Sequence, residues 1–316
     1  MVPIVPKSPA SGSALRSLRM GEANAAREGT QTVVEATTYV RFIILTYART
    51  GSTMFAASLN SSPDIICFRE LFNPIMDGIG FHVDGYDNSS AEDRALRDRD
   101  FKRFLQARIF CEHPREIRAV GFKMPYVHFR WFPGLLEWLV EHTEIRIVHL
   151  KRRNLLRMLV SLRIAQKTGG WAEDRKATLA SKLRPANALR AARHPLRAAN
   201  RLRAFLFPKE PAWKALRAPV TLSEGECRGF FAEIERDSAH YGRLFREHPQ
   251  LTLFYEDLFK DRKRAFNQAQ SFLGLKPRGL SITTRRQNPE PLRELIANHD
   301  ELYGAFSDTP EAAFFG

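Results

Sequence analysis

The chain has 316 residues, of which 44% are hydrophobic, so it can bury one substantial core or two smaller ones. Its three cysteines, Cys67, Cys111 and Cys227, form no CxxC or Cys/His spacing, which argues against a zinc or dithiol redox protein. Because the sequence contains neither a run of about 18 apolar residues nor the apolar core of a signal peptide, we expect a cytoplasmic location.

The positive charge is concentrated in one segment. The formal net charge is +14, but residues 175–217 contain twelve Lys or Arg and one acid, which leaves 37 basic and 34 acidic residues elsewhere. A nearly balanced remainder favours a local anionic contact over nucleic-acid binding by the whole chain. Regularly spaced leucines among the arginines of residues 175–217 indicate an amphipathic basic helix that could lie on an anionic membrane. The alternative is a helical subdomain with solvated arginines, and the prolines of the segment would interrupt one long helix.

In chain order, residues 1–36 are rich in Ala, Ser, Gly and Pro and predict a flexible tail. Residues 37–316 are expected to form one domain, with residues 175–217 as a basic helical insertion. Apolar runs predict buried strands at 40–47, 65–68, 119–124, 145–150 and 251–255, and helices are expected at 54–59, 91–111, 133–142, 154–167, 223–246 and 262–273. The alternation predicts a three-layer α/β fold, in which helices flank a central parallel sheet.

The segment after the first strand has the composition of an anion-binding loop. Arg49, Thr50, Gly51, Ser52 and Thr53 lie between a strand and a helix, where backbone N–H groups and the helix dipole favour an anion. Glycine allows the turn, the hydroxyls can donate, and the arginine can hold two oxygens. The loop is not a Walker A motif, because it lacks that motif's first glycine and its lysine. An ordinary capped turn is the alternative interpretation.

A second cationic segment follows the strand at 145–150. It consists of Lys151, Arg152 and Arg153. Three adjacent cations require solvent or an anionic partner. Ser161 lies eight residues after Arg153, about two helical turns, so both side chains could reach one phosphate.

The two motifs together resemble the sulfotransferases that use 3'-phosphoadenosine 5'-phosphosulfate (PAPS), in particular the bacterial branch of trehalose and nodulation-factor sulfotransferases. The resemblance implies a P-loop-like fold, a first loop that holds the 5'-phosphosulfate, and Arg153 and Ser161 as ligands of the 3'-phosphate. It implies PAPS as cosubstrate and no metal ion. It extends from about Thr38 to Leu302, includes Phe254 to Leu258, and departs from the family where Arg49 replaces a frequent lysine.

Glu70 is the candidate catalytic base. It follows the second strand, 21 residues after Arg49, and resembles the glutamate that serves as general base in the trehalose-type members. A surface glutamate paired with Arg69 is the alternative, and the rival bases are histidines: His82, His113, His128 and His149. Arg49 is also assigned a catalytic role, since it could stabilise charge on the leaving phosphate.

Three further predictions complete this interpretation. Arg286 lies where sulfotransferases often supply another cation to the 3'-phosphate, although an exposed arginine needs no function. Glu256 and Asp257 match a family landmark and are interpreted as structural, with Asp257 as a helix cap. The expected partner is a hydroxyl-bearing acceptor, either a glycan or a lipid-linked molecule, and the sequence leaves a homodimer open.

Two other functions remain open at this stage. A P-loop nucleotide kinase or other NTPase would use a similar strand, loop and helix, together with Mg²⁺ and the lysine that is missing here. A basic membrane- or nucleic-acid-binding protein without catalysis could use residues 175–217 alone.

Overall fold

The computed structural model describes residues 39–75, 78–168, 218–282 and 287–316. Within them, five parallel strands form a sheet in the order β2-β3-β1-β4-β5. The strands are β1 (Val40–Thr46), β2 (Ile65–Phe68), β3 (Ala119–Pro125), β4 (Arg146–Lys151) and β5 (Gln250–Phe254). Each strand agrees with its predicted range to within one residue at either end, and the predicted α/β class is confirmed.

The first strand occupies the centre of the sheet. β1 pairs with β3 on one side and with β4 on the other, so the chain changes from one half of the sheet to the other beside β1. In open parallel sheets, ligands bind at the carboxyl ends of the strands near such a change of direction. The topology therefore places a candidate site at the end of β1, where the predicted loop lies.

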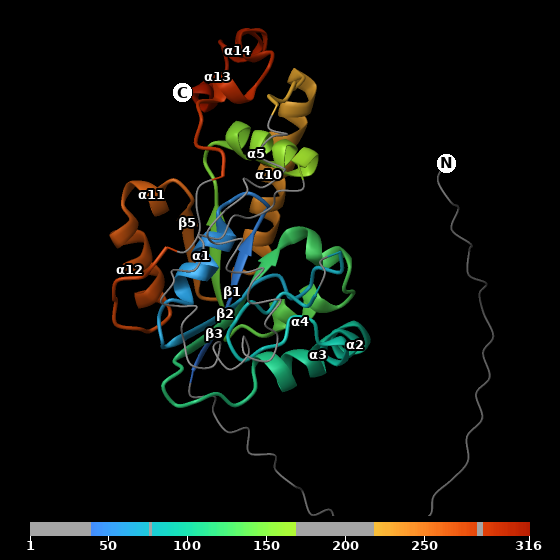
Figure 1. Ribbon diagram of the computed structural model, residues 1–316, viewed down its shortest axis with the longest axis vertical. Coiled ribbons are helices and arrows are strands. Elements are labelled where there is room, and N and C mark those ends of the chain that lie inside the picture. Colours follow the sequence, from blue (N-terminus) through green and yellow to red (C-terminus); the bar gives the residue numbers. More distant parts are fainter. Residues whose placement is uncertain (1–38, 76–77, 169–217, 283–286) are drawn as a thin grey trace, which may run out of the picture. The chain divides into compact units, whose positions relative to one another are not determined.

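Two cores form on the two faces of the sheet because alternate residues of a strand point in opposite directions. Phe42 and Ile44 of β1 pack with Phe266 into one core, and Ile43 and Leu45 belong to the other. Figure 1 shows α1 (Ser52–Leu59), α11 (Asp257–Lys260) and α12 (Arg262–Phe272) on one side of the strands, and α2 (Ala91–Arg99), α3 (Phe101–Phe104) and α4 (Leu135–Glu141) on the other. The sheet and the helices on its two sides form the predicted three layers.

A third core supports the helix that follows β4. It joins α5 (Leu155–Thr168), α10 (Glu224–Leu244), α13 (Leu292–Leu295) and α14 (His299–Phe306), with a single parallel bridge between Val220 and Ile296. The short turns are 3-10 helices η2 (Tyr126–Arg130) and η3 (Pro310–Phe315) and a π-helical turn η1 (Leu105–Ile109). This core fixes α5, which carries Ser161, next to the end of the sheet.

The helix predicted at 91–111 is interrupted. Asp100 leaves the helical conformation (φ −151°), and its side chain accepts a hydrogen bond of 3.0 Å from the backbone N–H of Arg103. An aspartate in this position caps a new helix, so α2 ends and α3 begins there.

Several predictions lie outside the described residues. They are the N-terminal tail at 1–36, the basic insertion at 175–217 and Arg286, and all three stay predictions. Within the described ranges, no helix combines the length and the apolar composition that crossing a bilayer requires.

Candidate active site

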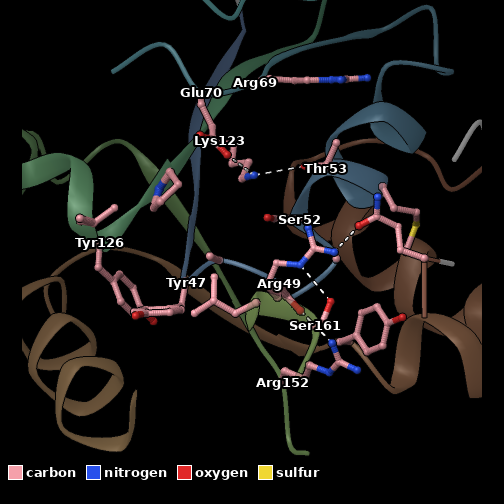
Figure 2. A pocket seen from close by; sticks show the side chains of 18 of the residues that line it. Tyr47, Arg49, Ser52, Thr53, Arg69, Glu70, Lys123, Tyr126, Arg152 and Ser161 are labelled. Carbon is pink, nitrogen blue, oxygen red and sulfur yellow. Dashed lines mark hydrogen bonds and ion pairs between the residues drawn. The ribbon is translucent and has the colours of Figure 1, made fainter. Parts of the chain in front are cut away.

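A cavity of about 790 Å³ opens at the carboxyl ends of the central strands. Five segments line it: the loop after β1, the residues after β2, the end of β3, η2 and helix α5. The lining also includes Tyr255, Phe259, Gln287 and Asn288. Segments that are far apart in the sequence therefore meet where the topology predicts a ligand site. Figure 2 shows the cavity with Glu70 and Lys123 near one another and with Arg49, Ser161 and Arg152 in a second group.

The loop after β1 depends on Gly51. This residue has φ 76°, and a Cβ atom there would lie 2.4 Å from a ring carbon of Tyr255. Only glycine allows both the left-handed conformation and the close aromatic contact. The tight turn lets α1 begin at the cavity, which Arg49, Gly51, Ser52 and Thr53 all line.

Thr50 differs from the rest of the predicted loop. Its side chain is buried away from the cavity lining, where its hydroxyl is 2.5 Å from Thr46 Oγ1 and donates to the backbone oxygen of Tyr47 at 3.0 Å. These bonds close the turn within the protein. The Thr50 hydroxyl is therefore a structural group in this conformation, and the predicted hydroxyl donors that face the cavity are those of Ser52 and Thr53.

Arg49 and Ser161 meet although 112 positions separate them. Arg49 Nε donates to Ser161 Oγ at 3.0 Å, and the Arg49 guanidinium also donates to Gln287 Oε1. Burial, together with the nearby charge of Arg152, lowers the pKa of Arg49 to about 10. The group stays protonated at neutral pH, and an anion in the cavity would favour its charged form.

Of the two arginines that follow β4, only Arg152 lines the cavity. Its Nη1 donates to the backbone oxygen of Arg49 at 2.9 Å, and its guanidinium lies 4.4 Å from the centre of the Tyr255 ring. Arg152 thereby fixes the loop and adds positive charge beside it. Arg157, one turn before Ser161 on α5, lines the same side of the cavity.

Arg153, the residue that the family resemblance assigns to the 3'-phosphate, lies elsewhere. Its guanidinium forms two hydrogen bonds with the Asp257 carboxylate, at 2.7 and 2.9 Å, and packs on the Phe254 ring. The side chain is 50% exposed and is not part of the cavity lining. In this conformation Arg153 could bind a phosphate in the cavity only by leaving Asp257.

Glu256 and Asp257 both form structural contacts, but the prediction that Asp257 caps a helix was wrong. The two carboxylate oxygens of Glu256 accept hydrogen bonds from the backbone N–H groups of Arg153 and Asn154, at 3.0 and 3.1 Å. Asp257 is the first residue of α11, and Glu256, not Asp257, occupies the preceding cap position. Glu256 thus satisfies backbone donors at the start of α5.

Glu70 lies on the opposite side of the cavity with polar partners on both oxygens. Lys123 Nζ is 2.5 Å from Oε1, Asn73 Nδ2 donates to Oε2 at 2.8 Å, and His128 Nε2 is 3.5 Å from Oε2. Burial alone would raise the pKa of Glu70, but the charge and hydrogen bond of Lys123 and the contact with His128 outweigh it and hold the pKa well below its usual range. The Glu70 carboxylate is therefore ionised at neutral pH. The sequence-based alternative, a surface glutamate paired with Arg69, is not what the structure shows.

Lys123 connects the two halves of the cavity. It is 5% exposed, lies on β3, and donates to Thr53 Oγ1 at 3.2 Å in addition to its ion pair with Glu70. Lys123 belongs to none of the sequence motifs. The available signal was a single charged residue near the carboxyl end of an otherwise apolar strand, which rarely occurs without a partner.

The four rival histidines separate into two groups. His82 and His128 line the cavity, whereas His113 and His149 do not. His149 pairs with the Tyr126 hydroxyl, and burial, with a smaller contribution from Lys151, lowers its pKa to about 3. Burial also lowers the pKa of His128, so both side chains are neutral at pH 7.

The chain is similar over most of its length to nodulation protein H of two rhizobia. It is 26% identical to the protein of Rhizobium tropici, covering 87% of this chain and 92% of that protein, and 24% identical to the protein of Rhizobium meliloti (strain 1021), covering 87% and 94%. No family profile matches the chain. The fold can also be aligned with a crystal structure of a sulfotransferase from Alicyclobacillus acidocaldarius, over 87% of this chain and 93% of that chain, at 16% identity and a TM-score of 0.40.

These relatives confirm the resemblance to the bacterial sulfotransferases of the nodulation-factor branch, which the two motifs had indicated. The similarity supports sulfotransferase activity as the class of function of this protein. The particular relatives are the nodulation H proteins, from which this chain differs at about three of every four aligned positions.

Proposed function

We propose that the protein transfers a sulfuryl group from PAPS to a hydroxyl group of a carbohydrate, glycolipid or other small acceptor. One observation carries the proposal. One cavity has Arg49 of the loop after β1 and Ser161 of α5 on one side. On the other side it has Glu70, an ionised carboxylate paired with Lys123. These are the groups that an anionic donor and a hydroxyl acceptor require.

The cationic side suits the donor. Arg49 and Arg152 provide positive charge, and Ser52, Thr53 and Ser161 provide hydroxyl groups beside the start of α1. Transfer of a sulfuryl group in line, like the related phosphoryl transfer, depends mainly on positioning and on electrostatic stabilisation of the transferred and leaving groups. In the proposed reaction, Arg49 stabilises the charge that develops on the leaving phosphate.

The carboxylate side suits the acceptor. Glu70 is ionised and 22% exposed, so it can accept the proton of a hydroxyl group as that oxygen attacks sulfur. Lys123 holds the carboxylate in place and lies between it and Thr53 of the donor loop. The transferred group would pass close to the Lys123 ammonium, which can stabilise its negative charge.

The test is incubation with sulfur-labelled PAPS and separate glycan and lipid extracts, followed by identification of the labelled product. Transfer to a hydroxyl of a glycan or lipid is expected, at a much lower rate in the Glu70→Gln protein. Failure of the wild-type chain to bind 3',5'-bisphosphoadenosine would contradict the proposal. Turnover of ATP with Mg²⁺ in place of PAPS would favour the nucleotide kinase or NTPase alternative.

The proposed place of action is the cytoplasm, with contact to the inner face of a membrane through residues 175–217. This part rests on the concentration of basic residues in that segment. A lipid-linked acceptor would then lie close to the enzyme. Neither nucleic acid nor a metal ion is needed for the proposed reaction.

A further inference from the structure

Asn288 lies against Ser161 although 127 positions separate the two residues. Its Nδ2 donates to Ser161 Oγ at 3.1 Å, and Arg49 Nε donates to the same oxygen at 3.0 Å. Asn288 and Ser161 both line the cavity, and Ser161 is 7% exposed. Nothing in the sequence motifs pointed to Asn288.

The two bonds determine what the Ser161 hydroxyl can do. A serine hydroxyl has one hydrogen to donate and two lone pairs that accept. Arg49 and Asn288 donate to the two lone pairs of Ser161 Oγ, so the hydroxyl hydrogen can only be donated to a third group. Among the residues that the structure describes, Ser161 Oγ donates to no protein group. The hydrogen is therefore available to an acceptor in the cavity.

Three donors thus converge at one place. They are the Arg49 guanidinium, the Ser161 hydroxyl and the Asn288 amide, which all line the cavity and are joined to one another through Ser161 Oγ. A group that accepts several hydrogen bonds and carries negative charge complements such a set. A phosphate has both properties.

Helix α5 also holds Asn288 in position. Arg157, one turn before Ser161, donates from Nη1 to the backbone oxygen of Asn288 at 3.1 Å and from Nη2 to that of Glu290 at 2.9 Å. Residues four apart lie on the same side of a helix, so one helix supplies both the hydroxyl and the arginine that fixes Asn288. The arrangement is built from several mutually dependent contacts.

We infer that Asn288 is a positioning residue of the donor site, which directs the Ser161 hydroxyl hydrogen toward a phosphate of the bound nucleotide. The inference rests on the proposed function for the identity of the nucleotide. Asn288 acts through Ser161, so its effect on binding depends on the presence of that hydroxyl.

The experiment is a double-mutant cycle on binding of 3',5'-bisphosphoadenosine, measured by calorimetry with folded full-length protein. Asn288→Leu, which is similar in size and cannot donate, is expected to weaken binding by about tenfold. The same substitution in a Ser161→Ala background is expected to change affinity by less than about twofold, because the group on which it acts is gone. Adenosine 5'-phosphate, which lacks the 3'-phosphate, is the second probe and assigns the effect to one of the two phosphates.

Asn288→Asp keeps the size of the side chain and replaces the donor with an acceptor. It is expected to weaken binding more than Asn288→Leu, and it also serves if the leucine variant fails to fold. Unchanged affinity in both variants would overturn the inference, and so would an equal loss with and without Ser161. A wild-type protein that does not bind the bisphosphate would instead contradict the proposed function, so the two failures are distinguishable.

Discussion

The ammonium group of Lys123 lies 2.5 Å from a carboxylate oxygen of Glu70, and this ion pair joins β3 to the residue that follows β2. The lysine also reaches Thr53 on the donor loop at 3.2 Å. A single buried cation therefore contacts both the expected base and the expected donor site. Its position makes the basicity of Glu70 dependent on Lys123.

The first prediction concerns the pH dependence of Lys123→Met. Burial raises the pKa of Glu70, whereas Lys123 is the main cause that lowers it. Without the lysine the pKa of Glu70 rises, so the carboxyl group is protonated at a higher pH than in the wild type. Below that pH it cannot act as a base. The acid limb of the kcat profile should therefore move upward, whereas the wild-type protein should show no such limb above the ordinary glutamate pKa of about 4.3.

The matched control for this prediction is Lys102→Met, which removes an exposed lysine of α3. Its profile should coincide with that of the wild-type protein. If the acid limb of Lys123→Met stays where it is in the wild type, Lys123 does not control the protonation of Glu70.

The second prediction separates binding from chemistry at Glu70. Glutamine in its place can still accept a hydrogen bond from Lys123 through its one oxygen, but it cannot take a proton. Glu70→Gln should therefore lower kcat by about 10²–10⁴-fold and leave affinity for the bisphosphate nearly unchanged. Arg49→Ala should damage both, since its cation meets the bound donor as well as the charge that develops in transfer. Single-turnover rates and calorimetry measure the two effects, and a Glu70→Gln rate above about a tenth of wild type would assign the proton to His128, His82 or water.

The strands were predictable from the sequence because a buried parallel strand is a continuous apolar run. By contrast, the sequence could not predict which of two neighbouring arginines faces the cavity. Arg152 and Arg153 are adjacent at the end of β4, and adjacent residues of an extended chain point to opposite sides. Which of them faces the cavity depends on the position of β4 in the sheet. The family resemblance implies Arg153 as a ligand, whereas Arg152 is the one that lines the cavity here.

Lys123 and Asn288 show a second limit of sequence analysis. Both have partners far away in the chain, at 53 and 127 positions, so no local pattern connects them to the site. Thr50 shows the converse. It belongs to the predicted loop, but its neighbours in the sequence did not reveal that its hydroxyl bonds to Thr46.

The third prediction tests the turn at Gly51. A methyl group at this residue would collide with the Tyr255 ring, and alanine would also be strained at φ 76°. Gly51→Ala should lower the melting temperature and weaken binding of the bisphosphate. Gly229→Ala is the control, since Gly229 lies within α10 with open space around its Cβ position, and alanine favours a helix. Equal melting temperatures for the two variants would contradict the proposed importance of the turn.

The fourth prediction concerns the basic segment at 175–217. Neutralising Arg190, Arg193, Arg197 and Arg201 should abolish sedimentation with anionic phosphatidylserine vesicles, because each basic residue near such a surface contributes about 1 kcal/mol to binding. Affinity for the bisphosphate should not change. Wild-type protein that stays in the supernatant with these vesicles at low salt would end the proposal of membrane contact.

The last prediction decides between Arg152 and Arg153 as nucleotide ligands. Arg152 is 7% exposed in its side chain and lines the cavity, whereas Arg153 is half exposed and bound to Asp257. Removing a buried cation beside a phosphate should weaken binding by more than about tenfold, and removing a surface ion pair should change it little. Calorimetry with the bisphosphate should therefore show a large loss for Arg152→Ala and a small one for Arg153→Ala. Asp257→Asn provides the additional test, because it releases Arg153 without removing it. A large loss for Arg153→Ala, together with tighter binding by Asp257→Asn, would show that Arg153 leaves Asp257 for the nucleotide, as the family resemblance implies.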